Sequence, residues 1–148
     1  MKLRTSILAL TLCTPIVQLA AQTGMAAPPP AALPSTILQP SLAILRTALS
    51  SLRVDRWKAS SAIRDDAASN VGSIQRDLQS TLPDLLAAAD AAPNSAAKAL
   101  PAYRNIEALY DVLLRVDAAA RLAAPTDQMS AIDQAVARLD DGRRALGV

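Results

Sequence analysis

Residues 38–53 read LQPSLAILRTALSSLR, and the positions of their leucines decide the fold class. The leucines recur in alternating steps of four and three residues, at Leu38, Leu42, Leu45, Leu49 and Leu52. This spacing places them along one face of an α-helix, as in a heptad repeat. The pattern predicts a first helix over about residues 38–54, with Pro40 in its first turn, where a missing backbone N–H costs nothing.

Three further segments show the same helical periodicity. Residues 61–91 are predicted to form one helix kinked by Pro83, and a split into two helices is the alternative. A third helix is expected to start near Pro101 and to run to about Ala123, and Thr126 is expected to cap a fourth. The apolar positions of the three segments are Ile63, Ala67, Val71, Ile74, Leu78, Leu82 and Leu85; Tyr103, Ile106, Leu109, Tyr110, Leu113, Val116 and Ala120; and Met129, Ile132, Val136 and Leu139.

Four amphipathic helices joined by short connections favour an all-α fold, an antiparallel up-down four-helix bundle. The turns of such a bundle alternate between its two ends. The connector around Trp57 should therefore lie beside the turn between the third and fourth helices, near residues 122–127. The turn within residues 91–100 should lie at the opposite end.

The N-terminus has the layout of a secretory signal peptide over residues 1–26. Two cations precede an apolar run over residues 7–21, and small residues follow. Cleavage is expected after Ala26, with Ala21 as the second choice. The sequence therefore predicts an exported bacterial protein, periplasmic or secreted.

The apolar run also bears on membrane anchoring. It has about 15 residues, whereas a spanning helix needs about 20, so no stable membrane span is expected after cleavage. Cys13 leaves lipidation open as an alternative, although Leu12 is large where that cleavage site needs a small residue. Residues 27–36, APPPAALPST, are expected to be a Pro/Ala-rich linker, and residues 37–148 the bundle domain.

The charge balance argues against a nucleic-acid partner. The formal net charge of the chain is +2, and Lys2 and Arg4 account for it, so the chain beyond the signal peptide is formally neutral. A neutral domain has no strong field for nucleic acid or for an anionic membrane. Cys13 is the only cysteine, so the mature domain must be stabilised by its apolar core rather than by disulfides.

Residue types for catalysis and metal binding are scarce. The chain has no His, and its only Glu is Glu107. Di-iron sites in bundles need several Glu and paired His, and haem or copper sites need His, Cys or Met ligands. The sequence predicts no metal, no cofactor and no enzymatic activity; an enzyme using Asp or Ser without His is the remaining alternative.

A cluster of Arg53, Arg56, Trp57 and Lys58 is the candidate partner-binding site. A Trp beside three cations fits a polyanion, a sugar or a partner peptide, and Trp and Arg are favoured interface anchors. The alternative is that Trp57 closes one end of the bundle, over Ile63 and Leu122, with the cations in solvent.

Two stretches carry a resemblance. They are RWKASSAIRDDAASNVGSIQRDLQSTLPDLLAAADAAP, which ends at Pro93, and YRNIEALYDVLLRVDAAARLAAP, from Tyr103 to Pro125. Together they resemble a group of uncharacterised small exported bacterial helical proteins. The resemblance implies a helical fold and an exported location, and it implies no activity, cofactor or site residue.

These observations favour a non-enzymatic binding or scaffold module with a protein or cell-envelope partner. The alternative is a homo-oligomerising or membrane-surface-associated assembly subunit. The leucine stripe of residues 38–52, next to a Pro-rich segment, motivates that alternative.

Overall fold

The computed structural model describes residues 32–147, and all regular secondary structure in that range is helical, which confirms the predicted all-α class. The predictions for the signal peptide, its cleavage sites, Cys13 and residues 27–31 lie outside the described residues. In chain order the elements are α1 (Pro34–Ser51), the 3₁₀ helix η1 (Val54–Arg56), α2 (Ser61–Gln79), α3 (Thr81–Asp90), α4 (Ala96–Ala123) and α5 (Thr126–Leu146).

Helix α1 begins earlier than predicted. Pro34 lies in its first turn, where the absent N–H is not needed, so residues 34–36 are helical rather than part of the linker. Pro40 lies inside the helix, is exposed, and removes one backbone hydrogen bond there. The helix ends at Ser51, and Leu52 already has an extended backbone with ψ 137°.

The prediction of one kinked helix over residues 61–91 is wrong, because the chain divides into α2 and α3 at Ser80. The φ of Ser80 is −126° and its ψ is −70°, outside the helical region. Its N–H still donates to the carbonyl of Arg76 at 3.0 Å, and its hydroxyl donates to the same oxygen at 2.8 Å. Pro83 then lies in the first turn of α3, where the helix does not require its N–H.

The starts of α2 and α5 differ in their caps. Ser60 Oγ accepts the N–H of Ile63 at 3.4 Å, so Ser60 caps α2. The prediction that Thr126 caps α5 is wrong, because Thr126 is already helical and Pro125 takes the capping position with φ −59° and ψ 151°. Asp127 in the first turn complements the helix dipole there.

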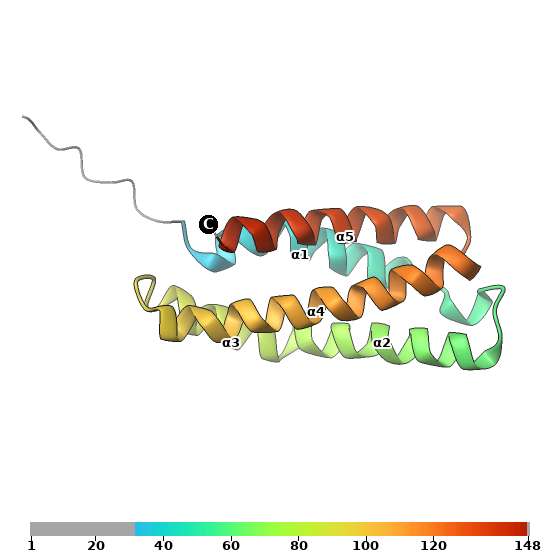
Figure 1. Ribbon diagram of the computed structural model, residues 1–148, viewed down its shortest axis with the longest axis horizontal. Coiled ribbons are helices and arrows are strands. Elements are labelled where there is room, and N and C mark those ends of the chain that lie inside the picture. Colours follow the sequence, from blue (N-terminus) through green and yellow to red (C-terminus); the bar gives the residue numbers. More distant parts are fainter. Residues whose placement is uncertain (1–31, 148) are drawn as a thin grey trace, which may run out of the picture.

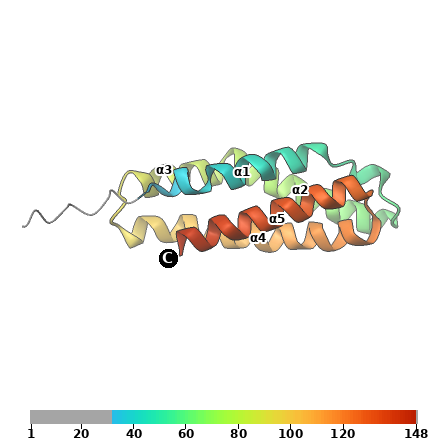
Figure 2. The same ribbon diagram turned by 90° about the horizontal axis from the view of Figure 1, so that it is seen from above.

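The α-helices lie side by side and run roughly along the long axis of the domain (Figures 1 and 2). Helix α5 packs against α1 and α4, and α4 also packs against α2 and α3. At one end, the N–H of Lys58 donates to the carbonyl of Ala123 at 2.9 Å, so the Trp57 connector lies beside the α4–α5 turn as predicted. At the other end, the N–H of Ser35 donates to Asp90 Oδ1 at 3.2 Å, which places the start of α1 beside the end of α3.

One apolar core runs along the helices. It includes the leucines of the first stripe, of which Leu38, Leu42, Leu45 and Leu49 are at most 4% exposed, while Leu52 is half-buried. These leucines are therefore buried inside the domain and are not available to contact another molecule. The other large, fully buried side chains are Trp57, Ile74, Leu82, Ile106, Leu113, Val116, Ile132 and Leu139.

Candidate functional site

The end of the molecule at η1 is organised by a buried glutamine. Gln128, in the first turn of α5, is 8% exposed, and its Oε1 accepts two hydrogen bonds. Trp57 Nε1 donates at 3.0 Å and the backbone N–H of Arg53 donates at 2.9 Å. A carbonyl oxygen has two lone pairs, so both are used. We call this arrangement of Trp57, Gln128 and the Arg53 N–H the Gln128 junction.

The structure separates the four residues of the candidate partner site into two groups. Trp57 is 2% exposed and part of the core, so its indole is not an accessible anchor. Arg53, Arg56 and Lys58 are exposed. We call these three residues the cationic loop. Arg56 Nε lies 3.9 Å from the Asp55 carboxylate, and both side chains are 76% exposed, so this pair contributes little energy.

The two neighbours predicted for a closing Trp57 are both exposed. Leu122 is 79% exposed and Ile63 is 38% exposed, so neither is a buried cover for the indole. The polar partner is instead Gln128, which the sequence analysis did not single out. A signal was present, since a buried indole N–H needs an acceptor, and Gln128 directly follows the turn predicted to lie beside Trp57.

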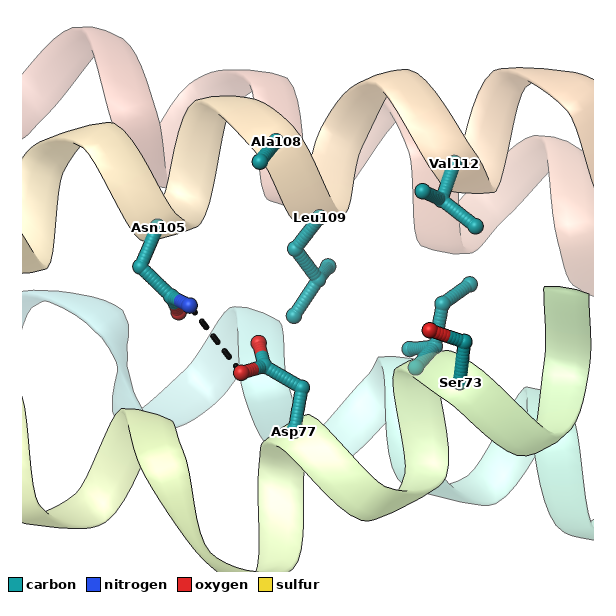
Figure 3. Close-up of a pocket in the computed structure, with 7 residues that line it drawn as sticks. Ser73, Asp77, Asn105, Ala108, Leu109 and Val112 are labelled. Atoms are coloured by element: carbon teal, nitrogen blue, oxygen red, sulfur yellow. Dashed lines mark hydrogen bonds between the residues drawn. The ribbon is translucent and has the colours of Figure 1, made fainter.

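A second polar feature joins α2 to α4. Asn105 Nδ2 donates to Asp77 Oδ1 at 3.0 Å, and the two side chains point toward each other across the gap between the helices (Figure 3). Ser73 lies on the same side of α2. These residues line a shallow cavity of about 200 Å³. Asn105 Oδ1 is buried and has no hydrogen-bond partner, so the pair is only half satisfied.

Ion pairs join α4 to α5 along the opposite side of α4. The Arg143 guanidinium donates to Glu107 at 2.9 and 3.1 Å and to Asp140 at 2.8 Å, and it lies 4.4 Å from the Tyr110 ring centre. The hydrogen bonds to Glu107, and then those to Asp140, raise the pKa of Arg143 above its ordinary value. Arg144 also pairs with Asp140. This cluster has internal charge balance, so it stabilises the helix contact rather than presenting a free charge.

A related pair lies nearer the α4–α5 turn. Arg121 Nε donates to Asp117 Oδ2 at 2.8 Å, and Arg121 also contacts Asp133 on α5. The hydrogen bond to Asp117 is the main cause of the raised pKa of Arg121. Asp111 and Arg115 have the same four-residue spacing, but they form no ion pair in the described structure.

The described residues contain no group of three or more His, Cys, Asp or Glu side chains placed to hold a metal ion. Within residues 32–147, no helix has both the length and the apolar character needed to cross a membrane. No family model, curated protein or solved structure matches this chain.

Proposed function

We propose that the chain is a non-enzymatic, exported helical module that binds a protein or cell-envelope partner through its cationic loop. The observation that carries this proposal is the Gln128 junction. It holds the backbone of Arg53 and the indole of Trp57 on one oxygen, so the exposed cations project from a loop of defined conformation. A preformed surface binds with less loss of conformational entropy than a flexible one.

We also propose how the helices of the domain are arranged and where the protein is located. The domain is an antiparallel up-down four-helix bundle in which α2 and α3 together occupy the second position. Support comes from one hydrogen bond at each end of the domain: the Lys58 N–H donates to the Ala123 carbonyl at one end, and the Ser35 N–H donates to the Asp90 carboxylate at the other.

Residues 1–26 act as a signal peptide, and the mature protein is periplasmic or secreted. N-terminal sequencing of the protein isolated from the exporting cells tests this, and a chain that begins at Met1 would contradict it.

Partner binding is tested with a tagged full chain expressed in an exporting bacterium. Its cell envelope is crosslinked, and the captured components are compared between the wild type and a triple variant, Arg53→Ala with Arg56→Ala and Lys58→Ala. We expect the triple variant to lose a component that the wild type captures. The three side chains are exposed, so the helical circular dichroism should not change.

The matched control removes three other exposed cations, with Arg76→Ala, Lys98→Ala and Arg104→Ala. It changes the net charge equally but leaves the cationic loop intact. We expect it to capture the same component as the wild type. Equal capture by the triple variant and the wild type, or equal loss in both variants, would contradict a role for this loop.

A further inference from the structure

The outward face of α4 carries a short apolar stripe that no other element covers. Leu114, Ala118 and Leu122 follow one another at four-residue spacing, so they lie on one side of the helix. All three are exposed, and Leu122, at 79%, is the most exposed large apolar side chain in the described structure. We call these residues the α4 stripe. Exposed apolar groups gathered on one face mark interaction surfaces more often than isolated ones do.

A groove of about 500 Å³ lies directly beside this stripe, between α2 and α4. Four of its nine lining residues, Ala67, Ser69, Ala118 and Ala119, have small side chains, which leave room for an inserted apolar group. Leu122 stands at its edge. The lining residues are Ile63, Asp66, Ala67, Ser69, Asn70, Arg115, Ala118, Ala119 and Leu122. The same face thus carries both a protruding leucine and a space that accepts one.

Two opposite charges flank the groove. Asp66 on α2 and Arg115 on α4 both line it, both are exposed, and neither forms an ion pair within the described residues. Arg115 would have been neutralised by Asp111 one turn earlier, but that pair is not formed. This face therefore carries one acidic side chain, Asp66, and one basic side chain, Arg115, neither of which forms an ion pair within the described residues.

We infer that this face binds a second copy of the chain. In a two-fold dimer the same patch faces itself, so every group must find its complement within the patch. The α4 stripe has the order Leu–Ala–Leu in both directions. With Ala118 at the two-fold axis, Leu114 of each copy opposes Leu122 of the other copy. The small Ala118 lets the two helices approach closely.

The charges and the groove fit the same arrangement. Asp66 of one copy lies on the side of the interface that carries Arg115 of the other copy. The two-fold symmetry therefore gives two equivalent Asp66–Arg115 ion pairs between the copies. Leu122 of each copy lies against the groove of the other. This inference does not rest on the proposed partner of the cationic loop, because that loop contributes no residue to the α4 stripe or to the groove.

The first test is sedimentation velocity of the full chain over a concentration series. We expect a concentration-dependent dimer, and Leu122→Glu should raise its dissociation constant by at least about tenfold. Leu100→Glu is the matched control, since Leu100 lies on the same helix, is 46% exposed and is outside the stripe. It should leave dimerisation unchanged. A wild type that stays monomeric, or association that survives Leu122→Glu, would overturn the inference.

A charge exchange tests the geometry. Asp66→Arg alone and Arg115→Asp alone should each weaken the dimer, because each places like charges opposite one another. The double variant restores opposite charges and should recover most of the wild-type affinity. Thermal unfolding followed by circular dichroism checks that each variant is folded. A double variant as weak as the single variants would overturn the proposed pairing.

Discussion

Trp57 Nε1 donates a hydrogen bond to Gln128 Oε1 at 3.0 Å, and this contact joins the end of η1 to the first turn of α5 across 71 residues of chain. The same oxygen accepts the N–H of Arg53. The Gln128 side chain therefore holds Arg53, which precedes η1, and Trp57, which follows it. The loop that presents the exposed cations depends on a residue that is distant in sequence and hidden from solvent.

Replacing this glutamine should destabilise the protein. Gln128→Ala leaves the Trp57 indole N–H and the Arg53 N–H without an acceptor, and we expect a loss of about 2–4 kcal/mol in the free energy of unfolding. Chemical denaturation measures it. Gln134→Ala, at an exposed position of the same helix, should stay within about 0.5 kcal/mol of the wild type. Equal effects of the two substitutions would show that the Gln128 junction contributes no stability.

Two helical glycines should respond oppositely to alanine. A Cβ at Gly142 would lie 2.8 Å from Ser41 Oγ and 3.1 Å from Leu38 Cδ2. Ser41 has little freedom to move, because its hydroxyl donates to the carbonyl of Arg138 at 2.7 Å. We expect Gly142→Ala to lower the free energy of unfolding by about 1–3 kcal/mol through overpacking between α1 and α5.

Gly72 provides the matched comparison. A Cβ there meets only the end of the flexible Arg76 side chain, at 3.6 Å. Alanine is the better helix former, so Gly72→Ala should raise the free energy of unfolding by up to about 1 kcal/mol. Denaturant titration of both variants measures the contrast. Stabilisation by Gly142→Ala would mean that α1 and α5 are not in contact at this point.

The contact between Asp77 and Asn105 should contribute measurably to stability. Asp77→Ala removes the acceptor of the Asn105 amide and should lower the free energy of unfolding by about 1 kcal/mol. Adding Asn105→Ala should cost less than the sum of the single effects, because the two side chains are coupled. Asp111→Ala, at an exposed position without an ion pair, serves as the control. Strict additivity would contradict the coupling.

Arg143 should be harder to replace than Arg138, although both pair with an acid three residues away. Arg143 reaches Glu107 as well as Asp140, whereas Arg138 lies 3.7 Å from Asp141 and both of those groups are largely exposed. Lysine cannot reproduce the forked contacts of arginine. Arg143→Lys should therefore lower the Tm, and Arg138→Lys should not.

The pH dependence of the Arg143 contribution follows from the sign of its pKa shift. The pKa is raised in the folded protein, so the stabilisation is complete below the pKa of the unfolded chain and is lost only as strong alkali deprotonates the guanidinium. The Tm difference caused by Arg143→Lys should stay constant from neutral to mildly alkaline pH. Differential scanning calorimetry at several pH values checks this, and a difference that disappears within that range would contradict it.

Periodicity in the sequence was sufficient for the helices and for most of the core. Most leucines of residues 38–53 and most apolar positions of the later segments lie inside, because a 3.6-residue period leaves one apolar face that must be buried, whereas Ile63 and Tyr103 are exposed. The sequence pattern was less successful in predicting where each helix begins. Pro34, Pro83 and Pro125 each occupy a helix start, and the periodicity of the flanking residues did not locate these starts.

The candidate site was predicted less completely. The sequence marked Trp57 and its neighbouring cations, but local pattern does not report which side chain is covered by a distant helix. Burial of Trp57, exposure of the cations and the role of Gln128 all depend on α5 lying beside η1. Likewise, the sequence drew attention to the leucines of α1, whereas packing buried those and left Leu114 and Leu122 exposed on α4.

The sequence by itself determined the all-helical class, the apolar face of each helix and the scarcity of residues for catalysis, because these follow from residue type and from the spacing of neighbours along the chain. The tertiary structure alone decided which charges are paired, which apolar groups remain exposed and which oxygen holds the cationic loop. Those outcomes depend on contacts between segments far apart in the chain, and spacing along a single helix carries no information about them.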